Sequence, residues 1–75
     1  MSDQKVMTVY IPAGTNKESV GKIVLFLERQ LVVNKNLSGY TFSIVESDSQ
    51  RVLVDGYHED AYTHQYLHRA LNSLL

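Results

Sequence analysis

Apolar and polar residues follow one another along this chain in patterns that predict its elements. Residues 5–11 are rich in Val, Thr, Tyr and Ile and end at the Pro-Ala-Gly of residues 12–14, which predicts a strand. Thr15 and Glu18 stand at the spacing of a capping box, so we expect a helix to begin there and to end at residues 34–39. Its core face is predicted by apolar residues at helical spacing, at Val20, Ile23, Val24, Leu27 and Leu31.

The second half of the chain predicts two further strands and a second helix. Residues 40–46 and residues 51–55 both alternate between apolar and polar side chains. The polar residues 47–50 between them suit a four-residue hairpin loop. A helix is expected from about residue 59 to residue 74, with a buried stripe of Leu67, Ala70, Leu71 and Leu74.

The order of elements is therefore strand, helix, strand, strand, helix, in a single domain over residues 1–75. We expect an α+β fold in which a three-stranded antiparallel sheet, ordered first, third, second, carries both helices on one face. This arrangement resembles a truncated ferredoxin-like fold that lacks its last strand. It would leave residues 6–11 of the first strand as an uncovered edge.

Composition excludes several classes of protein. Apolar residues make up 44% and charged residues 20%, which is typical of a globular domain. The chain has no Cys, which excludes a disulfide scaffold, a Cys-ligated metal and a thiol nucleophile. The apolar run of residues 23–27 is far shorter than a membrane span, and the N-terminus does not resemble a signal peptide. We therefore expect a cytoplasmic protein with no membrane partner and no cofactor.

The first helix carries more apolar surface than one sheet and one neighbouring helix are expected to cover. Leu25 and Val32 lie on one flank of its core face, and Phe26 and Val33 lie on the other. Only a narrow polar stripe remains, formed by Glu18, Lys22 and Arg29. One interpretation is that the second helix and residues 34–39 cover these flanks within one subunit. The other is that one flank contacts a partner chain, most simply a second copy around a two-fold axis.

Tyrosine is frequent, and two tyrosines bear on this question. Tyr62 and Tyr66 are one turn apart on the second predicted helix and flank its buried stripe. Rings at the margin of a core often serve only packing. Tyrosine is also enriched at protein interfaces, so we expect these two residues to form a second contact patch.

Three histidines suggest a metal site. His58, His64 and His68 fall within eleven residues, and the last two stand at i and i+4, a spacing that can chelate zinc with Glu59 or Asp60 as a third ligand. The segment is not a His-Glu-x-x-His motif, because Tyr62 stands where the second His belongs. The alternative is that His64 borders the core and His68 is solvated.

The sequence gives little support for nucleotide binding or nucleic-acid binding. A phosphate loop would need Gly where this chain has Asn16, and Ser or Thr where it has Ile23. We expect instead that Gly21 allows a close approach of another helix. Residues 9–11 and 39–42 resemble parts of the first-strand and third-strand motifs of RNA-recognition-motif domains. However, residues 39–42 would form the second strand, and Ser38 stands where that motif has a basic residue. The chain is therefore not assigned to that family.

These observations lead to one main hypothesis and two alternatives. The main hypothesis is a small non-enzymatic protein-interaction module of bacterial or phage type, a regulator, adaptor or inhibitor that forms a homodimer. Its predicted contact residues are Leu25, Phe26, Val32, Val33, Tyr62 and Tyr66.

The first alternative is a nucleic-acid-binding regulator that uses an open sheet face with Lys5, Tyr10 and Arg51. The chain has 7 Lys and Arg against 8 Asp and Glu, so it lacks the excess of cations that is typical of phosphate binding. The second alternative is metal binding by the three histidines.

Overall fold

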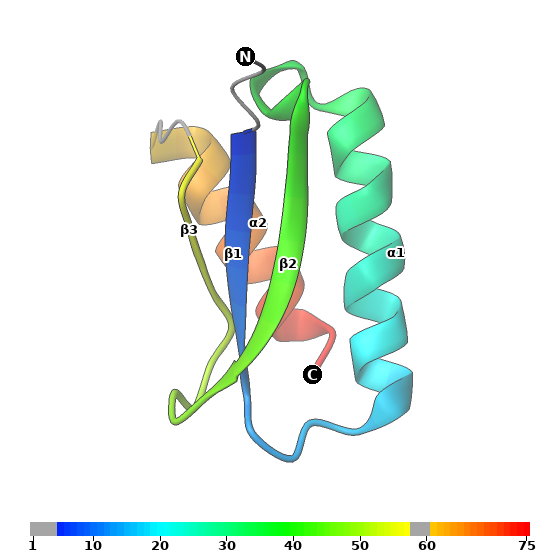
Figure 1. Cartoon of the computed structure of the whole chain (residues 1–75), viewed down its shortest axis with the longest axis vertical. Coiled ribbons are helices and arrows are strands. Elements are labelled where there is room, and N and C mark those ends of the chain that lie inside the picture. Colours follow the sequence, from blue (N-terminus) through cyan, green and yellow to red (C-terminus); the bar gives the residue numbers. More distant parts are fainter. Residues whose placement is uncertain (1–4, 58–60) are drawn as a thin grey trace.

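The computed structural model describes residues 5–57 and 61–75 of the chain (Figure 1). Strand β1 spans Lys5–Pro12 and leads into helix α1, Lys17–Val33. A short 3-10 helix, η1 (Lys35–Leu37), precedes strand β2, Tyr40–Ser47. Strand β3 (Leu53–Asp55) and helix α2 (Ala61–Ser73) complete the chain. The predicted order of two helices and three strands is confirmed.

The sheet differs from the expected one in strand order and direction. Its order is β2-β1-β3, with β1 parallel to β2 and antiparallel to β3. The expectation of an antiparallel sheet with the first strand at an edge is therefore wrong, because β1 lies in the centre. The sheet is mixed, and the likeness to a ferredoxin-like fold is not confirmed.

The expected hairpin between β2 and β3 does not form, because β3 pairs with β1, and serine side chains hold the connection between the two strands. Ser47 Oγ donates to the Ile11 carbonyl at 3.4 Å and accepts from the Ser49 N–H at 3.2 Å. Ser49 Oγ in turn accepts from the Arg51 N–H at 3.3 Å. The connection thus crosses the end of β1 and places β3 on its far side (Figure 1).

Helix α1 begins one residue later than the capping box predicts. The N-cap is Asn16, whose side-chain oxygen accepts from the Ser19 N–H at 2.8 Å. The Thr15 hydroxyl donates instead to the Pro12 carbonyl at 2.6 Å, so it belongs to the turn after β1. The expectation that Gly21 allows a close approach of another helix is wrong, because nothing lies within 4 Å of where its side chain would be.

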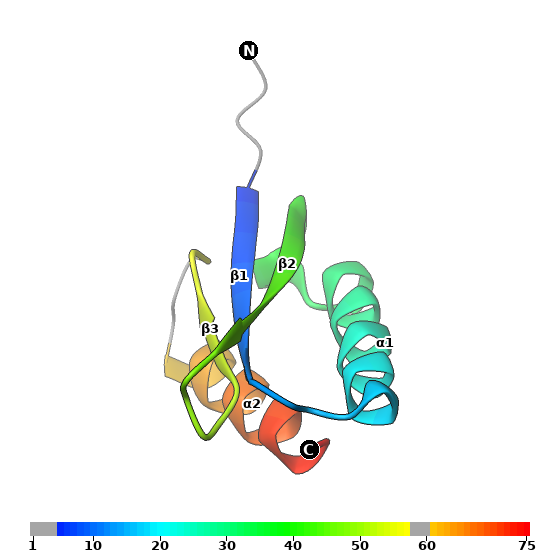
Figure 2. The ribbon, with the colours of Figure 1, turned by 60° about the horizontal axis from the view of Figure 1, so that its bottom comes forward.

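Both helices cover the same face of the sheet (Figure 2). On β1 the side chains of Met7, Val9 and Ile11 are buried, whereas Val6 on the other face is 43% exposed. These three side chains join residues of both helices in one hydrophobic core, which includes Ile23, Leu27, Leu37, Val52, Val54, Tyr57, Leu67 and Leu71. The expected placement of both helices on one face is therefore confirmed. Within residues 5–57 and 61–75, no helix is long and apolar enough to cross a membrane.

Candidate interaction surfaces

The flanks of α1 are not sealed within the subunit. Val32, Leu25 and Val33 are 84%, 69% and 59% exposed. Phe26 is half-buried against the core. Because Leu37 of η1 lies in the core, the segment after α1 covers the end of the core and not these three side chains.

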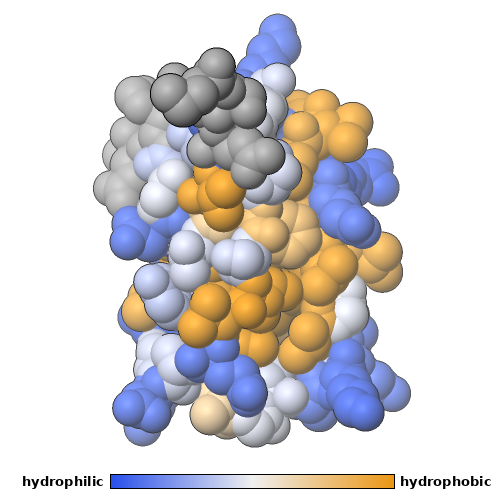
Figure 3. All heavy atoms as spheres, viewed as in Figure 1, coloured by the Kyte–Doolittle hydropathy of each residue, from blue (hydrophilic) through white to orange (hydrophobic). Residues whose placement is uncertain are grey.

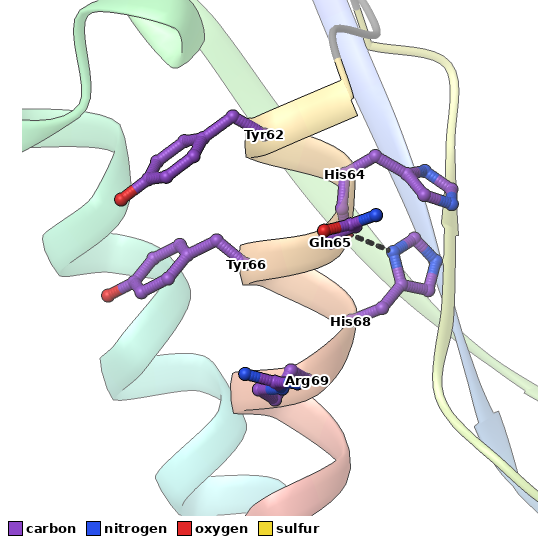
Figure 4. Close-up of a pocket in the computed structure, with 6 residues that line it drawn as sticks. All are labelled: Tyr62, His64, Gln65, Tyr66, His68 and Arg69. Atoms are coloured by element: carbon purple, nitrogen blue, oxygen red, sulfur yellow. Dashed lines mark hydrogen bonds between the residues drawn. The ribbon is translucent and has the colours of Figure 1, made fainter.

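An aromatic surface links the two helices on the face opposite the sheet. The ring of Phe26 on α1 lies 6.0 Å from the ring of Tyr66 on α2, and the Tyr66 ring stacks on that of Tyr62 at 6.5 Å. Tyr62 is 80% exposed and Tyr66 41%. Figure 4 shows both tyrosines extending from α2 toward α1. Val33 and both tyrosines also line a groove of about 410 Å³ between the two helices. We name Phe26, Val33, Tyr62 and Tyr66 the helix-face patch.

The structure divides the six predicted contact residues into two groups. Leu25 and Val32 lie on the flank of α1 away from the helix-face patch. The exposed side chains of Lys22 and Arg29 lie between the two groups around the circumference of the helix. We name Leu25 and Val32 the outer strip. The helical spacing in the sequence identified all six residues, but the contact between Phe26 and Tyr66 depends on how the two helices pack.

The two histidines that the structure describes, His64 and His68, both form hydrogen bonds with other groups of the chain. The Val54 N–H donates to His68 Nε2 at 3.1 Å, so Nδ1 of the same ring carries the proton that it shares with the His64 carbonyl at 2.8 Å. His68 is half-buried, and the expectation that it is solvated is wrong because it caps the backbone of β3. His64 Nδ1 lies 2.8 Å from the buried Tyr57 hydroxyl.

Of the proposed metal ligands, the structure describes only His64 and His68, whose ring centres lie 4.2 Å apart. His58, Glu59 and Asp60 lie outside the described residues. Among the residues that are described, no group of three His, Cys, Asp or Glu side chains is placed to hold a metal ion.

The three residues of the nucleic-acid alternative lie apart. Tyr10 is half-buried on the open face of the sheet, where its neighbours in register are Val45 and Leu53. Lys5 lies at the far end of β1 with its Nζ 5.6 Å from the centre of the Tyr40 ring. Arg51 is exposed before β3, at the opposite end of the sheet. No patch of cations forms around Tyr10 from these residues.

The open face of the sheet carries an apolar row that the sequence does not reveal. Tyr10 pairs with Val45 on β2 and with Leu53 on β3, so the three side chains form one row across the sheet. Val45 is 43% exposed and Leu53 42%. We name Val45, Tyr10 and Leu53 the sheet-face row. Only the central place of β1 brings these residues together, and sequence alternation does not specify that place.

Comparison with known proteins adds no relative. No family model matches the chain, and no curated protein or solved structure is significantly similar to it. The function has to be argued from the surfaces described above.

Proposed function

We propose that this chain is a small non-enzymatic protein-interaction module that forms a homodimer through the helix-face patch. The observation that carries the proposal is the exposure of aromatic and aliphatic side chains at the junction of the two helices. Tyr62 is 80% exposed although its ring lies against Tyr66, and Val33 is 59% exposed beside the same groove. A regulator, adaptor or inhibitor works through such a surface and needs no catalytic group.

The amount of apolar surface supports association. A tyrosine side chain carries about 150–250 Å² of surface, so Tyr62 and Tyr66 together leave a few hundred Å² open. Patches of a few hundred Å² are about the largest that a typical monomer exposes and are often functional, and Val33, 59% exposed, adds to this one. Burial of one large apolar side chain stabilises by about 1.5–3 kcal/mol, which is large for a chain of this size.

The composition of the patch also fits an interface. Aromatic side chains and arginine are enriched at the centres of protein interfaces. Arg69 follows Tyr66 by three residues on α2, and Lys35 lines the groove beside Tyr62. An aromatic centre with a polar rim is typical of protein interfaces, and a two-fold contact would bring two copies of this patch together. We place the dimer in the cytoplasm, because a chain without cysteine is suited to a reducing compartment.

The proposal is tested by measuring the mass of the full chain in solution. Sedimentation equilibrium from about 10 µM to about 1 mM should show a mass that rises with concentration. Val33→Glu places a charge in the helix-face patch and should raise the dissociation constant at least about tenfold. Val32→Glu places the same charge one residue away, on the outer strip, and serves as the matched control.

Each outcome of this experiment decides the proposal. A weaker association of Val33→Glu than of the wild type, with Val32→Glu unchanged, supports a contact at the helix-face patch. A wild-type chain that stays monomeric at the highest concentration overturns it, as does an unchanged Val33→Glu. Both sites are exposed, so thermal melts should show that both variants fold. Tyr62→Ala removes a ring without adding a charge and should weaken association in the same direction as Val33→Glu.

A further inference from the structure

The sheet-face row lies in the layer opposite the helix-face patch and faces away from both helices. Val45 and Leu53 flank Tyr10 in register, and all three side chains point to the open side because their neighbours along the strands face the core. We propose that this row is a second, independent docking surface and that its occupant is another copy of the chain.

The open face is almost free of charge. The side chains next to the row on β1 and β2 are Val6, Thr8, Thr41 and Ser43, which are apolar or uncharged. Within the described strands, Asp55 is the one charged side chain on this face. Figure 3 shows apolar atoms gathered over the strands and toward α1. A sheet face exposed to water is normally polar, so an uncharged face with an apolar row is suited to being covered.

A second copy of the chain offers the same sheet face as a partner. Two such faces can pack against each other with the sheets about 10 Å apart. A two-fold axis along the row would lay Tyr10 on its counterpart, with Val45 and Leu53 likewise meeting theirs. The contact then needs no surface other than the one that each copy already carries.

Charge complementarity supports the same axis. Arg51 and Asp55 are both exposed and stand two residues before and two residues after Leu53, so the two charges lie on opposite sides of the row. Rotation about the row brings Asp55 of one copy opposite Arg51 of the other, and the reverse. The two charges at the margin of the face are thus paired by self-association, whereas a nucleic acid would meet Asp55 as a repulsive charge.

The contact is expected to be weak by itself. Three strands about 4.8 Å apart, with a rise of about 3.3 Å per residue, give a face smaller than the roughly 800 Å² per partner of a standard interface. Together with the helix-face patch on the other layer, it would let dimers join into larger assemblies. The two contacts involve no common residue, so either can exist without the other.

Sedimentation equilibrium of the full chain with variants in each face tests the proposal. The mass of the wild type should pass that of a dimer near the top of the range, about 1 mM. Leu53→Glu should stop the mass at a dimer, and Leu53→Glu combined with Val33→Glu should leave a monomer. Thr41→Glu, which adds the same charge far from the row on the same face, is the matched control and should behave as the wild type.

Charge reversal tests the register directly. Asp55→Arg and Arg51→Asp should each raise the dissociation constant of the sheet-face contact at least about tenfold, and the double variant should restore it. Each variant is measured in the Val33→Glu background, where the sheet-face contact is the one that remains. A mass in that background that is insensitive to Leu53→Glu overturns the sheet-face proposal. An unchanged Val33→Glu overturns the helix-face proposal instead, so the two failures are distinguishable.

Discussion

Asn72 binds the backbone of Val52 through both ends of its side-chain amide. The Val52 N–H donates to Asn72 Oδ1 at 2.8 Å, and Asn72 Nδ2 donates to the Val52 carbonyl at 3.1 Å. One turn earlier on α2, His68 accepts from the Val54 N–H. Side chains of α2 therefore occupy the outer edge of β3, where another strand would pair. This closes one edge of the sheet against unwanted strand pairing.

Replacing Asn72 should destabilise the fold markedly. Asn72→Ala removes the two bonds to Val52 and a third from Asn72 Nδ2 to the His68 carbonyl at 2.7 Å. At about 1 kcal/mol for each bond, we expect a loss of about 2–3 kcal/mol in the free energy of unfolding, measured by urea denaturation. Ser73→Ala, which removes one local bond to the Ala70 carbonyl, is the control and should change it by less than about 0.5 kcal/mol. Equal effects of the two substitutions would refute the bridging role.

His68 should matter for stability and not for metal binding. His68→Ala leaves the Val54 N–H without its acceptor, so we expect a loss of about 1–2 kcal/mol. Added zinc should leave the melting temperature of the wild type unchanged, because both ring nitrogens of His68 are already engaged. A rise in melting temperature with zinc that His68→Ala abolishes would contradict this assignment and restore the metal hypothesis.

Local structure followed from the sequence, whereas strand pairing did not. The periodicity around Val20 and the alternation from residue 40 onward each report on which side chains face the core, and both are confirmed. Pairing depends on which strands meet, and the short polar segment 47–50 fits a hairpin as well as a crossing at the end of β1. The bonds of Ser47 and Ser49 accompany the crossing, and a pattern of apolar residues does not predict them.

The candidate surfaces, too, were only partly predictable from the sequence. Helical spacing correctly identified Leu25, Val32 and Val33 as exposed apolar residues, because the helix itself fixes their direction. The contact between Phe26 and Tyr66 and the pairing of Tyr10 with its neighbours needed the tertiary arrangement. The same holds for His68, because its acceptor role arises from the place of β3 beside α2.

Two glycines should respond to alanine in opposite ways. Gly21 lies inside α1 with open space around it, so Gly21→Ala should stabilise by about 0.5–1 kcal/mol through its higher helix propensity. Gly56 has φ +85°, and a Cβ there would lie 2.9 Å from the Val6 carbonyl oxygen. Gly56→Ala should therefore destabilise by more than about 1 kcal/mol. Thermal and urea unfolding measure both, and a stabilised Gly56→Ala would contradict the turn geometry.

The N-cap of α1 can be located by comparing substitutions at two adjacent residues. Asn16→Ala should lower the free energy of unfolding by about 1 kcal/mol, because the Ser19 N–H loses its acceptor. Asn16→Asp keeps an acceptor and adds a negative charge at the helix N-terminus, so it should be at least as stable as the wild type.

The same comparison separates the cap from the turn before it. Asn16→Gly should lose only a few tenths of a kcal/mol, since glycine is itself accepted at an N-cap. Thr15→Ala removes the bond to the Pro12 carbonyl but leaves the cap intact, so the helical signal in circular dichroism should persist at temperatures where Asn16→Ala has begun to lose it. If Thr15→Ala instead shortens the helix and Asn16→Ala does not, then the capping box expected from Thr15 and Glu18 is the true start of α1.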